Sequence, residues 1–208
     1  QRKSDTGTLA AERNPKSMKS TFPFAFKRGA AALAAASVAV CALLPAGGVV
    51  WAAETTTAES SDTFDDGTLT YKKLSNTTVS VTDCVESATH ISIMPKIDGY
   101  DIVSIGEEAF ANCTSLQSVT IPASVTEIGS AAFYGCTALT KVTVPDAVTK
   151  IEQGTFFSCT ALTDLTLGKD TTEIGDMAFG YCTSLETVTL PDTVETLGDQ
   201  LFYYCTAL

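Results

Sequence analysis

The chain has 208 residues, enough for one ordinary domain, with 24 acidic and 13 basic residues and a net charge of −11. Seven of the basic residues lie before residue 53, so the remainder of the chain is more strongly acidic than the whole. An acidic domain repels phosphate backbones and anionic lipid surfaces, which argues against nucleic acids and membrane surfaces as partners.

The chain begins with a segment that is typical of a targeting signal. Residues 1–17 are polar and start with Gln, and we interpret them as an upstream, non-native or mis-called segment. From Met18 a short basic stretch precedes an apolar run at 29–44, and the small residues Ala52 and Ala53 offer the cleavage point, which we place after one of them. These three features are typical of a secretory signal peptide. The sequence therefore predicts a signal peptide at 18–52 and a secreted or cell-surface location.

Two other interpretations of this segment stay open. A transmembrane anchor would need about 20 apolar residues, and this run is shorter and is followed by Pro45. Lipid attachment at Cys41 would favour a small residue before it, and Val40 stands there. We therefore expect no membrane insertion after the signal has been cleaved.

A linker and a cap are expected next. Residues 53–67 are polar with one aromatic, which predicts a flexible linker that ends in an Asp65-Asp66-Gly67 turn. Alternating apolar residues then flank Asn76-Thr77, which predicts a β-hairpin. Because the end of a stacked repeat needs an atypical covering unit, we interpret 68–87 as an N-terminal cap. Cys84 lies in this cap, outside the register described next.

From residue 88 to residue 208, three residue types recur every 23 positions. A fixed period of this length in independent columns is typical of stacked repeats, and we predict that the columns form the structural core. Their members are Cys113, Cys136, Cys159, Cys182 and Cys205; Phe110, Phe133, Phe156, Phe179 and Phe202; and Leu116, Leu139, Leu162, Leu185 and Leu208.

Each 23-residue unit predicts three segments. Val119 and Ile121 alternate with threonine, which is typical of a short strand with one buried face, and Pro122 ends that strand. Val125 and Ile128 predict a second short extended segment. Apolar residues then recur three to four positions apart, which predicts a helical turn. The predicted fold class is an α/β repeat solenoid with parallel first strands and a β-hairpin-like cap.

Some positions depart from this pattern. The first coil has extra residues around Asp98-Gly99, a tight-turn dipeptide, and we expect them to bulge outward as a longer loop. Gly129, Gly175 and Gly198 share one position in the repeat, but Glu152 occupies it in the third unit. A positive φ is therefore not expected to be required there.

The consensus Leu-x-x-Val-Thr-Ile-Pro-x-x-Val-Thr-x-Ile-Gly-x-x-Ala-Phe-x-x-Cys resembles the BspA-type (Treponema-type) leucine-rich repeat over 88–208. Ile97-Asp98-Gly99-Tyr100 also resembles the insert that opens such arrays. The resemblance implies a secreted or surface-attached bacterial protein, often an adhesin for host matrix proteins, or an accessory module of a larger surface protein. Glu152, Gly168 and Thr171 depart from the motif, which indicates local irregularity within the same fold.

The cysteine column raises the question of disulfides. Parallel side chains in neighbouring coils would hold their Cβ atoms about 4.8 Å apart, beyond the usual separation in a disulfide. We therefore interpret the five cysteines as buried thiols that act as small apolar residues. A linear column cannot supply a tetrahedral metal site either, so no metal is predicted. Secreted proteins ordinarily favour disulfides, so a count of free thiols in denatured, unreduced protein tests this interpretation.

No residue set predicts catalysis or a cofactor. His90 is the only histidine and lies just before the first predicted strand, so we expect it at the surface. Neither a Gly-x-Ser-x-Gly elbow nor a glycine-rich phosphate loop is present. Carboxylates such as Glu127 and Glu173 fall on variable surface positions rather than in pairs. The chain is predicted to be a non-enzyme that needs no cofactor.

The outward positions of the first strands are the candidate binding face, because solenoids present such faces as extended surfaces. Threonine also suits an exposed strand position, which is the competing structural explanation, and ice-like ordering of water along the threonines is a third. The candidate positions are Gln117, Ser118, Thr120, Thr140, Lys141, Thr143, Thr163, Asp164, Thr166, Glu186, Thr187 and Thr189.

We predict a binding or adhesion module for an extracellular protein or glycan, with host matrix proteins suggested by the resemblance and no nucleic-acid partner. The alternative is a non-catalytic scaffold module of a larger surface enzyme or cell-wall protein. The oligomeric state stays open. Because Leu208 is only the third residue after Cys205, we expect an array truncated mid-repeat, with further repeats downstream in the gene.

Overall fold

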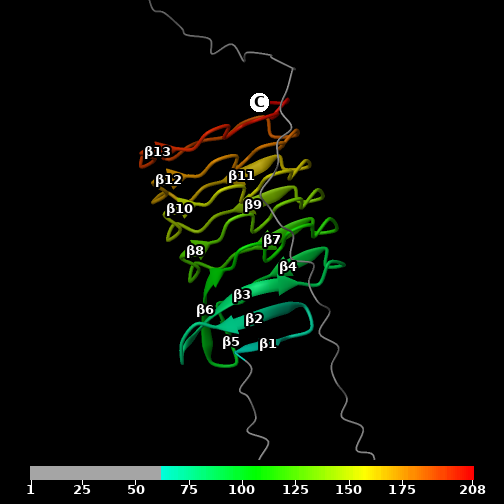
Figure 1. Ribbon diagram of the computed structural model, residues 1–208, viewed down its shortest axis with the longest axis vertical. Helices are drawn as coiled ribbons and strands as arrows, with labels where there is room; N and C mark the ends of the chain where they lie inside the picture. Colours follow the sequence, from blue (N-terminus) through cyan, green and yellow to red (C-terminus); the bar gives the residue numbers. More distant parts are fainter. Residues whose placement is uncertain (1–61) are drawn as a thin grey trace, which may run out of the picture. The chain divides into compact units, whose positions relative to one another are not determined.

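The computed structural model describes residues 62–208, so the upstream segment, the signal peptide and most of the linker lie outside the described residues. The described part is a stack of coils that runs from β1 (Thr63–Asp65) beside the cap to β13 (Thr196–Leu197) in the last coil (Figure 1). Strands and turns build this part of the chain, and it contains no helix. Within residues 62–208 there is accordingly no helix capable of crossing a membrane.

The cap is an antiparallel β-hairpin. β2 (Leu69–Lys73) pairs with β3 (Thr78–Cys84), as the alternation in the sequence predicts. Inward side chains such as Val81 are fully buried. β3 also pairs in parallel with β6 (Tyr100–Ile105) of the first coil, so the hairpin continues the hydrogen bonding of the stack and covers its first coil.

A further strand, β1 (Thr63–Asp65), pairs with β2 and shows that the linker prediction is wrong at its end. Phe64, the single aromatic of that segment, stacks on Tyr71 with ring centroids 5.3 Å apart and lies 5.9 Å from Tyr100. This aromatic contact anchors a strand in a stretch that is otherwise polar. The predicted turn follows β1, with Gly67 at a φ of 88°.

The extra residues of the first coil form a second hairpin. β5 (Lys96–Ile97) pairs antiparallel with β6, and Asp98 and Gly99 between them both have positive φ. A two-residue turn of this kind matches the twist of the flanking strands. The predicted tight turn is therefore confirmed, but the insert is a short hairpin and not a longer loop.

One side of the stack is a parallel four-stranded sheet. Its strands are β4 (His90–Ser92), β7 (Ser118–Thr120), β9 (Lys141–Thr143) and β11 (Asp164–Thr166), in that spatial order. The 23-residue period sets their register, with each residue of β9 opposite its repeat equivalent in β11. The central residue of each strand points inward and is buried, as the sequence predicts.

The repeat pattern also predicts a strand around Val188, and this prediction is wrong. Residues 187–189 form no strand, and β11 is the last strand of the sheet. Val188 is only partly buried, whereas the equivalent Val142 is fully buried.

The second predicted extended segment is present on another side of the stack. It comprises β8 (Glu127–Ile128), β10 (Lys150–Ile151), β12 (Glu173–Ile174) and β13 (Thr196–Leu197). β8 pairs in parallel with β6, and β12 pairs in parallel with both β10 and β13. The isoleucines point inward and are at most 1 % exposed, so this side closes a second face of the core.

A glycine follows this segment because neighbouring coils approach closely there. A Cβ on Gly129 would lie 2.5 Å from the backbone nitrogen of Glu107, and one on Gly175 would lie 2.7 Å from that of Gln153. Neither glycine has a positive φ. The expectation that this position does not require a left-handed residue is therefore confirmed, and close approach of the backbones explains the glycine.

The third side, which we call the turn side, is a series of tight turns, so the predicted helical turn is wrong. Two residues per coil have positive φ, and left-handed residues spaced four apart cannot belong to an α-helix. The first column is Glu108, Ala131, Gly154, Met177 and Gln200, and the second is Asn112, Gly135, Ser158, Tyr181 and Tyr204.

Alternate amides of the turn side bond to the next coil, and the amides between them close tight turns within their own coil. The amide of Phe110 donates to the carbonyl of Ala132 at 2.7 Å, and that of Phe133 donates to the carbonyl of Thr155 at 2.8 Å. A helix would use these amides within its own turn. Backbone hydrogen bonds therefore join the coils on all three sides, while the inward residues keep the apolar spacing seen in the sequence.

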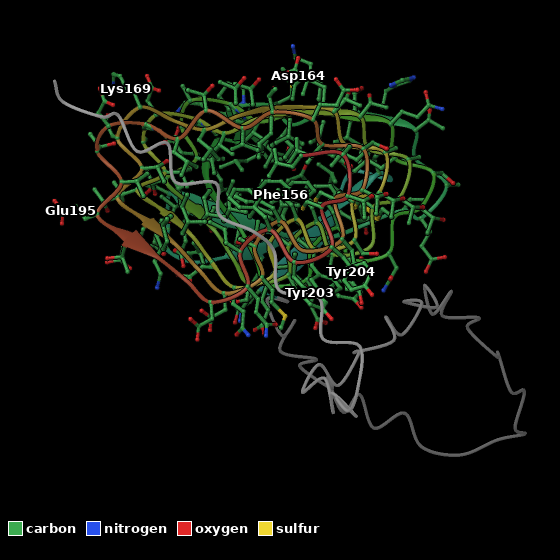
Figure 2. The ribbon with its side chains drawn as sticks, turned by 90° about the horizontal axis from the view of Figure 1, so that it is seen from above. Phe156, Asp164, Lys169, Glu195, Tyr203 and Tyr204 are labelled. Carbon is green, nitrogen blue, oxygen red and sulfur yellow. A yellow bond between two sulfur atoms is a disulfide. The ribbon has the colours of Figure 1, made fainter. Side chains whose placement is uncertain are left out.

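The phenylalanine column fills the centre of the stack, as Figure 2 shows for Phe156. Neighbouring rings are stacked, with centroids 4.9 Å apart between Phe110 and Phe133 and 5.9 Å apart between Phe156 and Phe179. These four side chains are fully buried, whereas Phe202 in the last coil is only partly buried. The predicted core column is thus present, and its last member has the least cover.

Candidate functional site

The outward strand face consists of the outward side chains of the sheet β4-β7-β9-β11 and their continuation at 186–189. Successive side chains of a strand point to opposite faces, so Lys141 and Thr143 are exposed on either side of buried Val142. Figure 2 shows Asp164 pointing away from the coil on this side. All the candidate positions are exposed except Ser118, which is half-buried. Those at 186–189 extend from an irregular segment rather than from a strand.

Two threonines of this face serve the stack itself. The hydroxyl of Thr140 donates to the carbonyl of Gln117 at 3.2 Å, and that of Thr163 donates to the carbonyl of Thr140 at 3.3 Å. Each bond ties one coil to the preceding coil. Both threonines lie just before a strand, so this hydrogen bond to the preceding coil, and not a preference for strand positions, gives them a structural role.

The threonine column at the other outward position differs from this pair. The hydroxyls of this column are exposed and form no hydrogen bond to another described residue. Parallel strands repeat about every 4.8 Å, so the hydroxyls form a regular row of donors and acceptors. A polar partner could bond to this row without displacing any contact of the fold. Its members are Thr120, Thr143, Thr166 and Thr189.

A second row across the sheet carries histidine and an ion pair. His90 Nδ1 and Ser118 Oγ are 2.8 Å apart, and Lys141 Nζ lies 2.6 Å from Asp164 Oδ2. The strand register places Ser118 opposite both His90 and Lys141, so the row is continuous. His90 is exposed, as expected. Its place in this face was not predicted, although Ile91-Ser92-Ile93 has the same alternation as the later strands.

The contact between His90 and Ser118 is not organised for catalysis. A nucleophile and its base need a third group that orients the base, together with donors for an oxyanion. Among the described residues, no carboxylate bonds to His90. In the same part of the chain, no group of three or more His, Cys, Asp or Glu side chains is placed to hold a metal ion. The face offers hydrogen bonding and charge.

The cysteine column has a hydrogen-bonding role in the core. The thiol of Cys136 donates to the carbonyl of Phe110, with Sγ 3.0 Å from the oxygen. The same bond, at 3.0 to 3.2 Å, is made to the phenylalanine of the preceding coil by Cys159, Cys182 and Cys205. Burial raises the pKa of Cys136 to about 12, so the thiol keeps its proton and remains a donor. These four cysteines are free, as predicted from the sequence.

Cys113 is the exception, and the prediction that it is a thiol is wrong. It forms a disulfide with Cys84 of the cap. In the cap, Ser87 stands where a preceding coil would have its phenylalanine, and Cys84 is close by in the sequence. The geometric argument against pairing applies only between members of one column. The available signal was a cysteine outside the register in a chain with a predicted signal peptide.

Thiol alkylation tests this arrangement. In the native protein at about pH 8, we expect Cys205 to react first, because it is only half-buried. Cys159 should stay unmodified until the protein unfolds, because burial raises its pKa well above the ordinary value. In denatured, unreduced protein, Cys136 and Cys182 should react as well, whereas Cys84 and Cys113 should need a reductant. Peptide mass spectrometry measures each site, and alkylation of Cys113 before reduction would contradict the disulfide.

Comparison with protein families identifies the repeat. The model of the BspA type leucine rich repeat region matches residues 84–208 in six copies. No curated protein matches the chain. The family match begins at Cys84, so it includes the last residue of β3 as well as the coils described above.

Several solved structures are similar to this chain. A leucine-rich-repeat protein of T. pallidum is 30% identical, with a TM-score of 0.65, and the match covers 70% of this chain and 68% of that one. One from Bacteroides ovatus is 34% identical, with a TM-score of 0.66, and the match covers 70% of this chain and 39% of that one. A leucine-rich cell surface protein of Faecalibacterium prausnitzii is 35% identical, with a TM-score of 0.60, and the match covers 69% of this chain and 40% of that one.

The match thus spans about two thirds of the T. pallidum chain and less than half of the other two. The first two are described as leucine-rich-repeat proteins, and the family model covers more than half of this chain. The stack of 23-residue coils and its core columns agree with these matches. The chain belongs to the BspA-type leucine-rich-repeat family.

Proposed function

We propose that the chain is a binding or adhesion module of a secreted or cell-surface bacterial protein, and that it recognises an extracellular protein or glycan through the outward strand face. The observation that carries the proposal is the threonine column from Thr120 to Thr189, whose hydroxyls are exposed and unbonded. Export is supported by the signal peptide predicted at 18–52. A similar protein of F. prausnitzii is described as a cell surface protein.

The charge of the face supports a polar partner with little net charge. Its only ionised side chains are Lys141, Asp164 and Glu186, and the first two pair with each other. The chain as a whole has a net charge of −11, so this face is a nearly neutral surface on an acidic protein. Hydrogen bonds to hydroxyls and amides would then supply most of the recognition. Host matrix proteins and neutral glycans both present such groups.

The alternative is a non-catalytic scaffold module that holds other parts of a larger surface protein. It is favoured by the match to only 39% and 40% of the lengths of two similar proteins. The threonines that bond to the preceding coil also show that part of the face serves stability. The two functions differ in one respect: a scaffold module would bind no ligand of its own.

An array of extracellular matrix proteins and glycans tests the proposal. We expect the chain to bind at least one of them, and Thr143→Arg to weaken that binding by about tenfold or more, because a long charged side chain would cover the middle of the threonine column. The matched control is Thr149→Arg. Thr149 is exposed in the same repeat but lies outside the outward strand face, beside β10. Affinity is measured by surface plasmon resonance.

Three results would count against binding through this face. No ligand in the array would favour the scaffold alternative. Equal losses for Thr143→Arg and Thr149→Arg would indicate a general effect of charge or stability. Unchanged affinity in Thr143→Arg would place the binding site elsewhere on the chain.

A further inference from the structure

Three columns of outward side chains contain the lysines of the later coils. Strand pairing sets two of them in register, with Lys141 opposite Asp164 and Lys150 opposite Glu173. The third column lies in the loop after the first strand, where the amide of Lys169 donates to a carboxylate of the preceding coil at 3.0 Å. We call these the lysine columns, and their members are Ser118, Lys141, Asp164 and Thr187; Ala123, Asp146, Lys169 and Asp192; and Glu127, Lys150, Glu173 and Thr196.

The ion pairs between coils all occur in these columns. Among residues 62–208, three ion pairs cross from one coil to another, and each of them joins coil 136–158 to coil 159–181. Figure 2 shows Asp164 and Lys169 pointing away from the coil. The nitrogen–oxygen distances are 2.6 Å for Lys141–Asp164, 3.8 Å for Lys150–Glu173 and 3.3 Å for Lys169–Asp146.

The sign of the charge alternates along each lysine column. Wherever two neighbours in a column are both charged, the charges are opposite. These neighbours are Lys141 and Asp164, Glu127 and Lys150, Lys150 and Glu173, Asp146 and Lys169, and Lys169 and Asp192. Wherever two residues that lie two coils apart are both charged, the charges are alike. These are Glu127 with Glu173, and Asp146 with Asp192.

The turn side has no such alternation. Asp176 and Asp199 are neighbours of like charge there, and Asp176 Oδ1 accepts a hydrogen bond from the amide of Asp199 at 2.7 Å. This bond to the backbone favours a carboxylate at 176 whatever the charge of its neighbour. The alternation is therefore a property of the lysine columns.

The apolar core does not distinguish one coil from the next. The cysteine and phenylalanine columns hold the same residue in every coil, so a coil could pack on the coil two places away and keep these contacts. The coil between them would loop out, and the entropic cost of such a loop grows only slowly with its length. Misassembly between equivalent units is a characteristic failure of repeat proteins. The outward columns are where the coils differ.

We propose that the alternating charge of the lysine columns selects the order in which the coils stack during folding. Successive coils present opposite charges to each other, whereas coils two apart present like charges or a charge facing a neutral residue. A single exposed ion pair contributes little to the stability of a folded protein. The competing arrangements share the same core contacts, however, so a small difference at the surface is enough to separate them.

Refolding of the full chain from urea, with its disulfide intact, tests the proposal by circular dichroism. We expect Lys141→Gln/Lys150→Gln/Lys169→Gln to lower the fraction of chains that refold in the fastest phase by roughly twofold, because more chains pass through stacks in the wrong order. Lys141→Arg/Lys150→Arg/Lys169→Arg is the matched control. It keeps the charges and should refold like the parent. In about 1 M salt the parent should approach the glutamine variant, because the charges are then screened.

Deleting 136–158 forces two coils that are normally two apart into contact. In the shortened chain Glu127 would face Glu173, whereas in the full chain it faces Lys150. Glu127→Lys should therefore raise the denaturation midpoint of the shortened chain and lower that of the full chain. Glu186→Lys makes the same change of charge in a column that has no other charge, so its effect should have the same sign in both chains.

Three results would overturn the proposal. The first is a glutamine variant that refolds like the parent, and the second is an arginine variant that refolds as poorly as the glutamine variant. The third is a shift of the same sign for Glu127→Lys in both chains, which would indicate a general relief of net negative charge. If the shortened chain does not fold, the refolding experiment on the full chain decides alone.

Discussion

Replacing Phe156 with alanine is expected to lower the free energy of unfolding by about 3–5 kcal/mol. Phe156 is fully buried and stacks between Phe133 and Phe179, at centroid distances of 5.4 and 5.9 Å. Its loss opens a cavity in the middle of the stack and removes contacts with the coils on both sides. Because those coils also bond to each other through their backbones, the cavity cannot close by a simple collapse.

The matched control is Phe202→Ala, which removes the same side chain from the last coil. Phe202 is only partly buried and has one stacked neighbour, Phe179, at 5.6 Å. Its replacement should cost clearly less. Chemical denaturation of both variants measures the difference. Equal losses at the two positions would show that the core column does not carry the stability that its burial indicates.

Removing the disulfide is expected to have the second large effect. Cys84→Ala should lower the free energy of unfolding by about 3–4 kcal/mol, because the bond closes a long loop in the unfolded chain. Cys84 and Cys113 are 29 residues apart, and the loop includes β4 and both strands of the first-coil hairpin. Without the bond, the cap is held to the first coil by packing, by the pairing of β3 with β6 and by single side-chain contacts such as Lys73 Nζ over the Tyr100 ring at 5.4 Å.

Reducing conditions provide the control for this variant. Dithiothreitol should lower the stability of the parent chain to that of Cys84→Ala and should leave the variant unchanged. Cys182→Ala provides a second control: Cys182 is free, so this variant keeps the disulfide and should lose as much stability in dithiothreitol as the parent chain does. A parent chain whose denaturation midpoint does not respond to dithiothreitol would contradict a stabilising role for the bond.

Much of the fold could be predicted because the same pattern of core residues recurs in every 23-residue unit. A column such as Phe110 to Phe202 has one explanation when every member keeps the same step, and the structure stacks those rings in order. The alternation around Val142 predicts both the strand and its exposed face. The Asp98-Gly99 turn is local chemistry, because both residues tolerate a positive φ.

The turn side could not be predicted, because its left-handed positions have no consistent residue type. Glu108, Ala131 and Met177 all have positive φ, although such residues rarely adopt it. Hydrogen bonds to the next coil favour that conformation. These bonds join different coils, so they cannot be inferred from the residues of a single repeat. The spacing of inward residues is the same for a helical turn and for two tight turns. Backbone hydrogen bonds to the neighbouring coil favour the tight turns over the helical turn.

The remaining errors concern contacts between distant residues. The strand at 63–65 depends on Phe64 meeting Tyr71 and Tyr100, and the disulfide depends on Cys84 meeting Cys113. For the candidate face, the sequence predicts which threonines point outward. It does not predict that the hydroxyl of Thr140 would bond to the preceding coil while that of Thr143 would not. This difference between the two threonines arises from the way the coils stack, since the residue type is the same.

The backbone bonding on all three sides also limits how such a chain can change its length. One residue gained or lost on one side would shift every later pair on the other two, and a shift of one residue turns inward side chains outward. The length of the chain can therefore change by whole 23-residue coils, because each added coil forms its own backbone hydrogen bonds to its neighbours on all three sides. The hairpin of β5 and β6 shows the permitted exception: its extra residues pair with each other, and the parallel pairing of β6 with β8 continues beside them.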